Sequence, residues 1–264
     1  MIIIGELINS TRKSIAQAIE RKDSNFLQDL ARRQAKAGAN YIDVNTASTG
    51  DEIKNMIWVV DLIQEVVDVP LCIDSPNPLA LEAGLARCRQ KPLVNSISAE
   101  TERWDKVLPL IQKYGARVVA LCMDNKGMPE TMEDRLRVAE ALVNGLTAAG
   151  VPAEDIFLDP LVKPLGVYHD AGIEILNSAR TLKQRYPDSH LVSGLSNVSF
   201  GLPERRLLNR AFLVMSVAAG MDAFILDPLD QTIMSLASAA YTLAGHDEYC
   251  MEYISGVRAG KVKA

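Results

Sequence analysis

Two patterns of hydrophobic and polar residues alternate along the chain. Short runs of aliphatic and β-branched residues recur, and each is followed by a longer segment whose apolar residues are three and four positions apart. The short runs predict buried strands and the longer segments predict amphipathic helices. Successive strands begin roughly 20 to 40 residues apart, as parallel strands joined by helices require. The expected strands are Ile2–Gly5, Tyr41–Val44, Leu71–Ile73, Leu93–Asn95, Arg117–Cys122, Ile156–Leu158, Leu191–Leu195 and Ala223–Leu226.

Capping residues mark several helix ends. Asp23 precedes a helix that we expect to stop at Gly38. Thr131–Asp134 has the form of a capping box, and Gly150 is expected to end that helix. Pro203 is expected at the first position of a helix, where proline is tolerated.

Eight strand–helix repeats in 264 residues predict a TIM (β/α)8 barrel, an α/β fold that forms a single domain over residues 1–264. A doubly wound open sheet is the alternative. Such a sheet usually carries a glycine-rich phosphate loop after its first strand, and Gly5–Asn9 has no such spacing. No shift in composition or linker divides the chain.

The composition of the chain limits the class of ligand that we expect and the expected location of the protein in the cell. The chain is 48% hydrophobic and 23% charged, with a formal net charge of −5. Lysines and arginines are not clustered, which argues against nucleic acid. The longest uncharged segment, Gln231–Gly245, contains several polar residues, so we expect no membrane span. The first residues read as a strand and not as a signal peptide, so we expect a soluble, cytoplasmic protein.

Polar side chains are expected at one end of the barrel. The carboxyl ends of barrel strands carry the active site, and each expected strand is followed there by an acid or an amide, never by Lys, Arg, His or Cys. One such residue is ordinarily a loop or helix cap, but a complete ring is harder to explain by capping. The ring consists of Glu6, Asn9, Asp43, Asn45, Asp74, Ser75, Asn95, Ser96, Asp124, Asn125, Asp159, Ser196, Asn197 and Asp227.

This ring predicts a flat, nitrogen-rich, neutral ligand. A phosphate would require cations or a glycine nest, whereas a carboxylate accepts two parallel hydrogen bonds from an amino-pyrimidine edge such as that of a pterin. No histidine lies beside a strand-end nucleophile in the sequence, which argues against nucleophilic catalysis. No histidine-rich metal shell is present, so we predict no metal site. His169 follows the sixth strand and is expected either to line the mouth or to lie in an exposed loop.

Six short motifs resemble the pterin-binding methyltransferase family. They occur in order along almost the whole chain. They are Gly-Glu-x-Ile-Asn at 5–9, Ile-Asp-Val-Asn at 42–45, Cys-Ile-Asp-Ser at 72–75, Val-Asn-Ser-Ile-Ser at 94–98, Leu-Asp-Pro at 158–160 and Gly-Leu-Ser-Asn-Val-Ser-Phe at 194–200.

The resemblance implies a homodimeric barrel that binds tetrahydrofolate or 5-methyltetrahydrofolate as substrate. It implies methyl exchange between folate N5 and the cobalt of a corrinoid (cobalamin). Asp74, Asn95 and Asp159 match the pterin-ring ligands, and Asn197 matches the catalytic Asn near N5. The remaining residues of the expected pterin site are Glu6, Asp43, Asn45, Ser196 and Phe200.

The sequence departs from the family pattern at two positions. Leu7 stands where some relatives have Arg, which is expected to remove a cation from the mouth. Phe200 replaces a Gln of the acetogen-type enzymes and agrees with the methionine-synthase-type motif. The chain has no Asp-x-His-x-x-Gly loop for cobalt, so the corrinoid is expected on a separate partner protein.

Two alternatives remain open. A dihydropteroate synthase would hold a pyrophosphate, and the end of the eighth strand at Asp227–Pro228 argues against that. A folate-binding subunit without catalysis is also compatible with the motifs. Turnover of methyltetrahydrofolate with free cob(I)alamin distinguishes the enzyme from the binding subunit.

Overall fold

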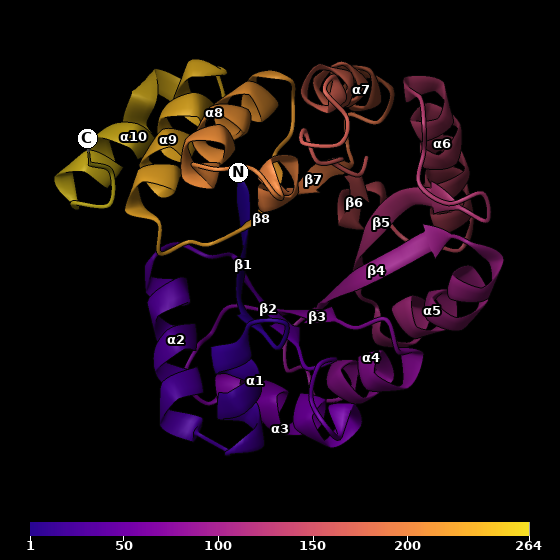
Figure 1. Ribbon diagram of the computed structural model, residues 1–264, viewed down its shortest axis with the longest axis vertical. Helices are drawn as coiled ribbons and strands as arrows, with labels where there is room; N and C mark the ends of the chain where they lie inside the picture. The colour runs from indigo at the N-terminus through magenta and orange to yellow at the C-terminus, as the bar shows by residue number, and fades with distance from the viewer. Residues whose placement is uncertain (264) are drawn as a thin grey trace.

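The computed structural model describes residues 1–263, which form a closed barrel of eight parallel strands in sequential order (Figure 1). The expected TIM barrel is therefore confirmed, and each expected strand is present. Several strands extend beyond the expected ends, while the seventh begins and ends one residue earlier. The strands are β1 (Ile2–Asn9), β2 (Tyr41–Asn45), β3 (Leu71–Asp74), β4 (Leu93–Ala99), β5 (Arg117–Asp124), β6 (Ile156–Asp159), β7 (His190–Gly194) and β8 (Ala223–Leu226).

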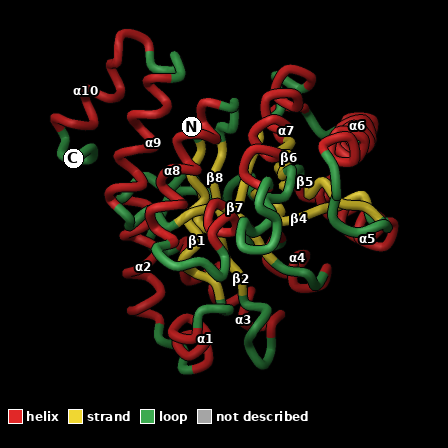
Figure 2. Tube along the Cα trace, turned by 45° about the horizontal axis from the view of Figure 1, so that its top comes forward, coloured by secondary structure: helices red, strands yellow, loops and turns green. Residues whose placement is uncertain are grey.

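Helices surround the strands on the outside of the barrel, as Figure 2 shows. After the last strand, α9 (Gln231–Leu243) packs against α8 (Arg205–Ala218), and α10 (Met251–Arg258) packs against α9 (Figure 1). The α-helices are α1 (Lys13–Glu20), α2 (Ser24–Lys36), α3 (Glu52–Gln64), α4 (Pro78–Leu85), α5 (Thr101–Tyr114), α6 (Met132–Ala148), α7 (Ala171–Arg185), α8 (Arg205–Ala218), α9 (Gln231–Leu243) and α10 (Met251–Arg258). Short 3-10 helices are η1 (Ala153–Asp155), η2 (Leu195–Ser199) and η3 (Glu248–Cys250).

The helix ends follow the expected caps with one exception. Asp23 caps α2 through the Phe26 amide, and Thr131 and Asp134 form the reciprocal capping box of α6. The placement of Pro203 at the first helical position is wrong. The chain leaves η2 through a turn, Glu204 adopts a left-handed φ of +49° as the N-cap, and α8 begins only afterwards.

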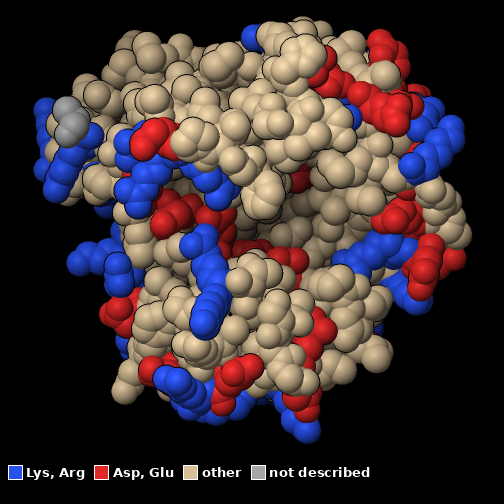
Figure 3. All heavy atoms as spheres, viewed as in Figure 1, with Lys and Arg blue, Asp and Glu red and all other residues tan. Residues whose placement is uncertain are grey.

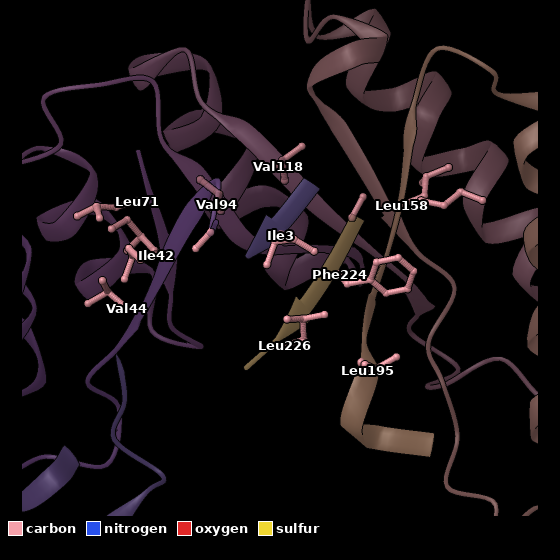
Figure 4. Packing of buried hydrophobic residues seen from close by; sticks show 14 of the residues in the cluster. Ile3, Ile42, Val44, Leu71, Val94, Val118, Leu158, Leu195, Phe224 and Leu226 are labelled. Carbon is pink, nitrogen blue, oxygen red and sulfur yellow. The ribbon is translucent and has the colours of Figure 1, made fainter. Parts of the chain in front are cut away.

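Two separate cores hold the barrel. The larger core fills the layer between the strands and the helices (Figure 4). The smaller one lies inside the barrel and takes one buried residue from each strand, so that side chains close the interior as in other barrels of this type. These interior residues are Ile4, Tyr41, Cys72, Leu93, Val119, Phe157, Val192 and Ala223.

Side chains alternate between the two faces of a strand, so a residue two positions after an interior residue also faces the inside of the barrel. Two positions after Ile4, Cys72, Leu93 and Phe157 come Glu6, Asp74, Asn95 and Asp159. The interior layer thus forms the floor of an open mouth at the carboxyl ends of the strands. Among the described residues, no helix is both long and apolar enough to cross a bilayer.

Candidate functional site

Three polar side chains from adjacent strands lie at one level of the mouth. The pairing of β2, β3 and β4 puts Asn45 opposite Asp74 and Asp74 opposite Asn95. Parallel strands in register project such residues from the same face of the sheet. These three expected site residues are therefore brought together. A cavity of about 310 Å³ is lined by Asp74, Asn95 and the loops that follow them.

Hydrogen bonds orient the row formed by Asn45, Asp74 and Asn95, and they leave one carboxylate oxygen of Asp74 without a donor. Asn45 Oδ1 accepts from Ser10 Oγ at 3.0 Å and from the Ala47 amide at 3.1 Å. Its Nδ2 is therefore directed away and donates to Asp74 Oδ2 at 2.9 Å. Within residues 1–263 nothing donates to Asp74 Oδ1. That oxygen is available to a ligand with an N–H group.

Asp43 lies below the row and interacts with it. Asn95 Nδ2 donates to Asp43 Oδ1 at 3.4 Å. Burial, and then the nearby Asp74 carboxylate, raise the pKa of Asp43 well above its ordinary value. Burial also raises the pKa of Asp74, although the hydrogen bond from Asn45 opposes this. The two acids resist ionising together, because like charges in a buried site repel.

Asp159 enters the mouth from β6, on the far side of the barrel from β2. Its Oδ1 accepts from the Leu161 amide at 2.8 Å. Burial raises the pKa of Asp159 to about 7, against an ordinary value of 3.8. Near neutral pH this carboxyl group can therefore either donate or accept a hydrogen bond. Such a perturbed acid in a cleft is typical of a functional site.

A second cavity, of about 380 Å³, lies between β1, β7 and β8 at the same end of the barrel. Glu6, Ser196 and Asp227 contribute to its lining, together with Arg206 and Arg210 of α8. Burial raises the pKa of Glu6, and Arg12, which contacts its Oε1 at 2.6 Å, opposes that shift. Figure 3 shows a hollow in this face with acidic side chains in it and basic ones beside it.

Asn197 lies in η2, directly after β7. The side-chain amide of Asn197 lies close to Gly194. A Cβ added to this glycine would lie only 3.0 Å from Asn197 Nδ2. The glycine therefore leaves the space that Asn197 occupies. Asn197 is exposed, and its side-chain amide has no hydrogen-bond partner within residues 1–263. A free carboxamide at a strand end is suited to meet a ligand.

Arginines from the surrounding helices also reach the mouth, although none was expected from the strand ends and none is found there. Arg103 of α5 lines the first cavity, and Arg206 and Arg210 line the second. No strand end carries a cation, so a search of strand ends did not find them. The first turns of helices stand beside the carboxyl ends of strands, and a long arginine side chain reaches the mouth from there. Arg103 and Arg206 lie in the first turns of α5 and α8, and this position was the signal in the sequence, whereas Arg210 lies one turn further along α8.

Leu7 does not alter the charge of the mouth as expected. Its side chain is 8% exposed and belongs to the core between strands and helices. Glu6 faces the mouth, so its neighbour along the strand faces the opposite side. The substitution at this position affects packing against the helices.

Other members of the expected ring have structural roles. Asp124 contacts Arg137 at 2.9 Å and accepts from the Lys126 amide. Asn125 accepts from the Thr101 amide at the start of α5. These residues cap the loop after β5 and do not line either cavity.

Two expected residues lie at the outer rim. His169 is exposed in the loop before α7 and lines neither cavity. Phe200 is 67% exposed after η2, with the Arg205 guanidinium 5.9 Å from its ring centre. Phe200 is thus placed beside the mouth and not on its floor.

Comparison with known proteins identifies the family to which the chain belongs. The model of the pterin binding enzyme family matches residues 5–227. The chain is 37% identical to methylcorrinoid:tetrahydrofolate methyltransferase of Eubacterium limosum over 99% of this chain and 98% of that protein. It is 31% identical to the methionine synthase of Mycobacterium tuberculosis over 85% of this chain, which corresponds to 20% of the larger protein.

Solved structures show the fold alone. Yersinia pestis dihydropteroate synthase superposes with a TM-score of 0.65 at 18% identity, over 94% of this chain and 93% of that one. A second dihydropteroate synthetase, solved with a product, superposes with a TM-score of 0.67 at 20% identity, over 92% of this chain and 94% of that one. With a matching family model over most of its length and a relative that matches from end to end, this chain belongs to the family of pterin-binding enzymes.

Proposed function

We propose that the protein transfers a methyl group from a corrinoid, carried by a partner protein, to N5 of tetrahydrofolate. The end-to-end match to the Eubacterium limosum methyltransferase carries this proposal, and the name of that relative gives the direction. The site supports it independently, because it offers acceptors and amides of the kind that a reduced pterin binds.

Asp74 and Asp159 are the acceptors for the pterin. The free Oδ1 of Asp74 and the adjacent Asn95 amide, on neighbouring strands, present a paired acceptor and donor. Asp159 faces them across the mouth and takes part in either protonation state. Glu6, Asp43, Asn45 and Ser196 complete the wall of the site.

Asn197 acts on the reacting nitrogen. Its free carboxamide accepts from the N5–H of tetrahydrofolate through Oδ1, which leaves the nitrogen lone pair free to attack the methyl carbon, and it can donate to N5 through Nδ2 once the methyl group is on that nitrogen. In the reverse direction N5 is a poor leaving group, and the same donor stabilises the electron pair that develops on it. The corrinoid supplies or accepts the methyl group at its cobalt.

The partner approaches over an apolar part of the rim. Three consecutive rim loops and the start of α8 expose large apolar side chains, namely Met128, Val167, Tyr168, Phe200 and Leu207, and the last of these loops also carries Asn197. The Leu165 amide donates to the Val198 carbonyl, which joins two of these loops. Because cobalt must reach N5 next to Asn197, we propose that the corrinoid protein docks here. The expected homodimer and cytoplasmic location stay predictions.

A second candidate is dihydropteroate synthase. Arg206 and Arg210 supply the cations that the sequence did not indicate at the mouth. Arg210 is already paired with Asp230 at 3.1 Å, however, and the solved synthases share the fold at low identity only. The full-length methyltransferase relative therefore favours the first function.

The test combines the purified protein with tetrahydrofolate and methylcobalamin, free or on a corrinoid protein, and follows the cobalt absorbance. Formation of 5-methyltetrahydrofolate with release of cob(I)alamin is expected. Asn177→Ala on α7, which removes an exposed amide far from the mouth, is the matched control for Asn197→Ala. Folate binding without turnover would show a binding subunit, and dihydropteroate formation from a pterin pyrophosphate would show a synthase.

A further inference from the structure

One arginine connects the two strands that carry Asp74 and Asn95. Arg103 lies in the first turn of α5, and its Nε donates to the Ser96 carbonyl at 2.8 Å. Its two terminal nitrogens donate to the carbonyls of Pro76 and Ser75, at 2.8 and 2.9 Å. One guanidinium thus holds the residue that follows each of the two expected ligands.

The same arrangement occurs at the other two expected ligands. Arg135, in the first turn of α6, is fully buried and its Nε donates to the Pro160 carbonyl, directly after Asp159, at 2.8 Å. Arg205, the first residue of α8, donates to the Ser196 carbonyl, directly before Asn197, at 2.8 Å. Three helices therefore each send an arginine to a backbone carbonyl beside an expected ligand.

These positions are electrostatically unfavourable for a cation. The amino-terminal end of a helix carries a partial positive charge, which disfavours a nearby arginine. The hydrogen bonds to the carbonyls offset that cost. Only a guanidinium offers several donors in one rigid plane, so a lysine cannot make all three contacts of Arg103.

We propose that Arg103, Arg135 and Arg205 are positioning residues, which fix the strand-end loops so that Asp74, Asn95, Asp159 and Asn197 keep the orientation that a pterin requires. The identity of the ligand as a pterin rests on the proposed function. The hydrogen bonds between the arginines and the loops do not depend on it, so the anchoring of the loops can be tested without a ligand.

The experiment compares Arg103→Met and Arg103→Lys with wild type and with Arg87→Met. Arg87 is a matched control, because its Nε contacts Asp61 at 2.9 Å on the surface and lies away from the mouth. Tetrahydrofolate affinity is measured by fluorescence titration from pH 5 to 9, and the methyl-transfer rate at saturating folate. Amide hydrogen exchange is followed at Ser75, whose N–H donates to the Asn95 carbonyl.

Both Arg103 variants should lose about 10- to 100-fold in folate affinity, by analogy with the loss of a group that orients metal ligands. Ser75 exchange should rise about tenfold or more, while Arg87→Met matches wild type. The pH dependence of affinity should move upward only in Arg103→Met, because Lys keeps the charge beside Asp74.

Three results separate the possible failures. Wild-type affinity in both Arg103 variants would overturn the proposal. Wild-type folate affinity in Arg103→Lys alone would also overturn the proposal, because a positive charge at this position would then be sufficient for binding without the geometry of the guanidinium. If wild-type protein binds no folate while Ser75 exchange still rises in Arg103→Met, the proposed function fails and the loop anchoring stands.

Discussion

The replacement Asp159→Asn tests the electrostatics of the mouth most directly. The introduced asparagine would keep the size of the side chain and an oxygen for the Leu161 amide, which now donates to Asp159 Oδ1 at 2.8 Å. The change removes only the ability to ionise. The side chain is 7% exposed, so its charge is poorly solvated when it forms.

The magnitude follows from the shift in pKa. Burial raises the pKa of Asp159 from 3.8 to about 7. Because the folded-state value is the higher one, proton binding stabilises the fold. That stabilisation is complete below about pH 4 and is lost as the pH rises through about 7. The whole shift corresponds to about 4 kcal/mol, of which roughly 2 to 3 kcal/mol falls between pH 5 and 8.

Urea unfolding of wild type and Asp159→Asn at about pH 5 and pH 8 measures this difference. The stability of the variant relative to wild type should increase by roughly 2 to 3 kcal/mol over that interval. The titration of Asp43 and Asp74 is common to both proteins and largely cancels. An equal difference at both pH values would show that Asp159 ionises normally and would refute the reasoning.

Three further changes test the site and the packing. Asn197→Ala should slow methyl transfer by about 10- to 1000-fold while folate still binds, as for loss of one preorganised donor; equal losses in affinity and rate would make Asn197 a ground-state ligand. Asp74→Ala should weaken pterin affinity about tenfold or more by removing a charged acceptor, and an unchanged fluorescence titration would exclude it from the site. Gly84→Ala should destabilise by about 1–3 kcal/mol, because the new Cβ would lie 2.8 Å from Ile73 Cγ2; an unchanged urea midpoint would contradict that packing.

The fold could be predicted because it depends on local periodicity. Each buried run specifies its own strand, and the spacing between runs leaves room for one helix. The same periodicity puts Asp74 and Asn95 two positions above the interior residues of their strands, so their convergence was also predictable. Leu7 was misplaced because the strand-end argument treated neighbouring residues as equivalent, although adjacent side chains face opposite sides.

The partners of these side chains could not be predicted. Arg103 is separated from Ser75 by 28 positions, and nothing in the spacing indicates that its guanidinium meets that carbonyl. The raised pKa of Asp159 likewise depends on burial, which the sequence does not give residue by residue. Such long-range features arise when several loops close over the same end of the barrel.

The position of the arginines explains how acids and cations coexist in one mouth. A guanidinium placed directly on Asp74 would use the acceptor that the ligand needs and would hold the carboxylate ionised. Arg103 instead donates to the carbonyls of Ser75, Pro76 and Ser96. It therefore stabilises the loops while Asp74 Oδ1 remains free, and the donor that completes this carboxylate has to come from the ligand. The uncharged, N–H-bearing edge of a pterin ring satisfies that requirement, whereas an anionic group presented to Asp74 does not.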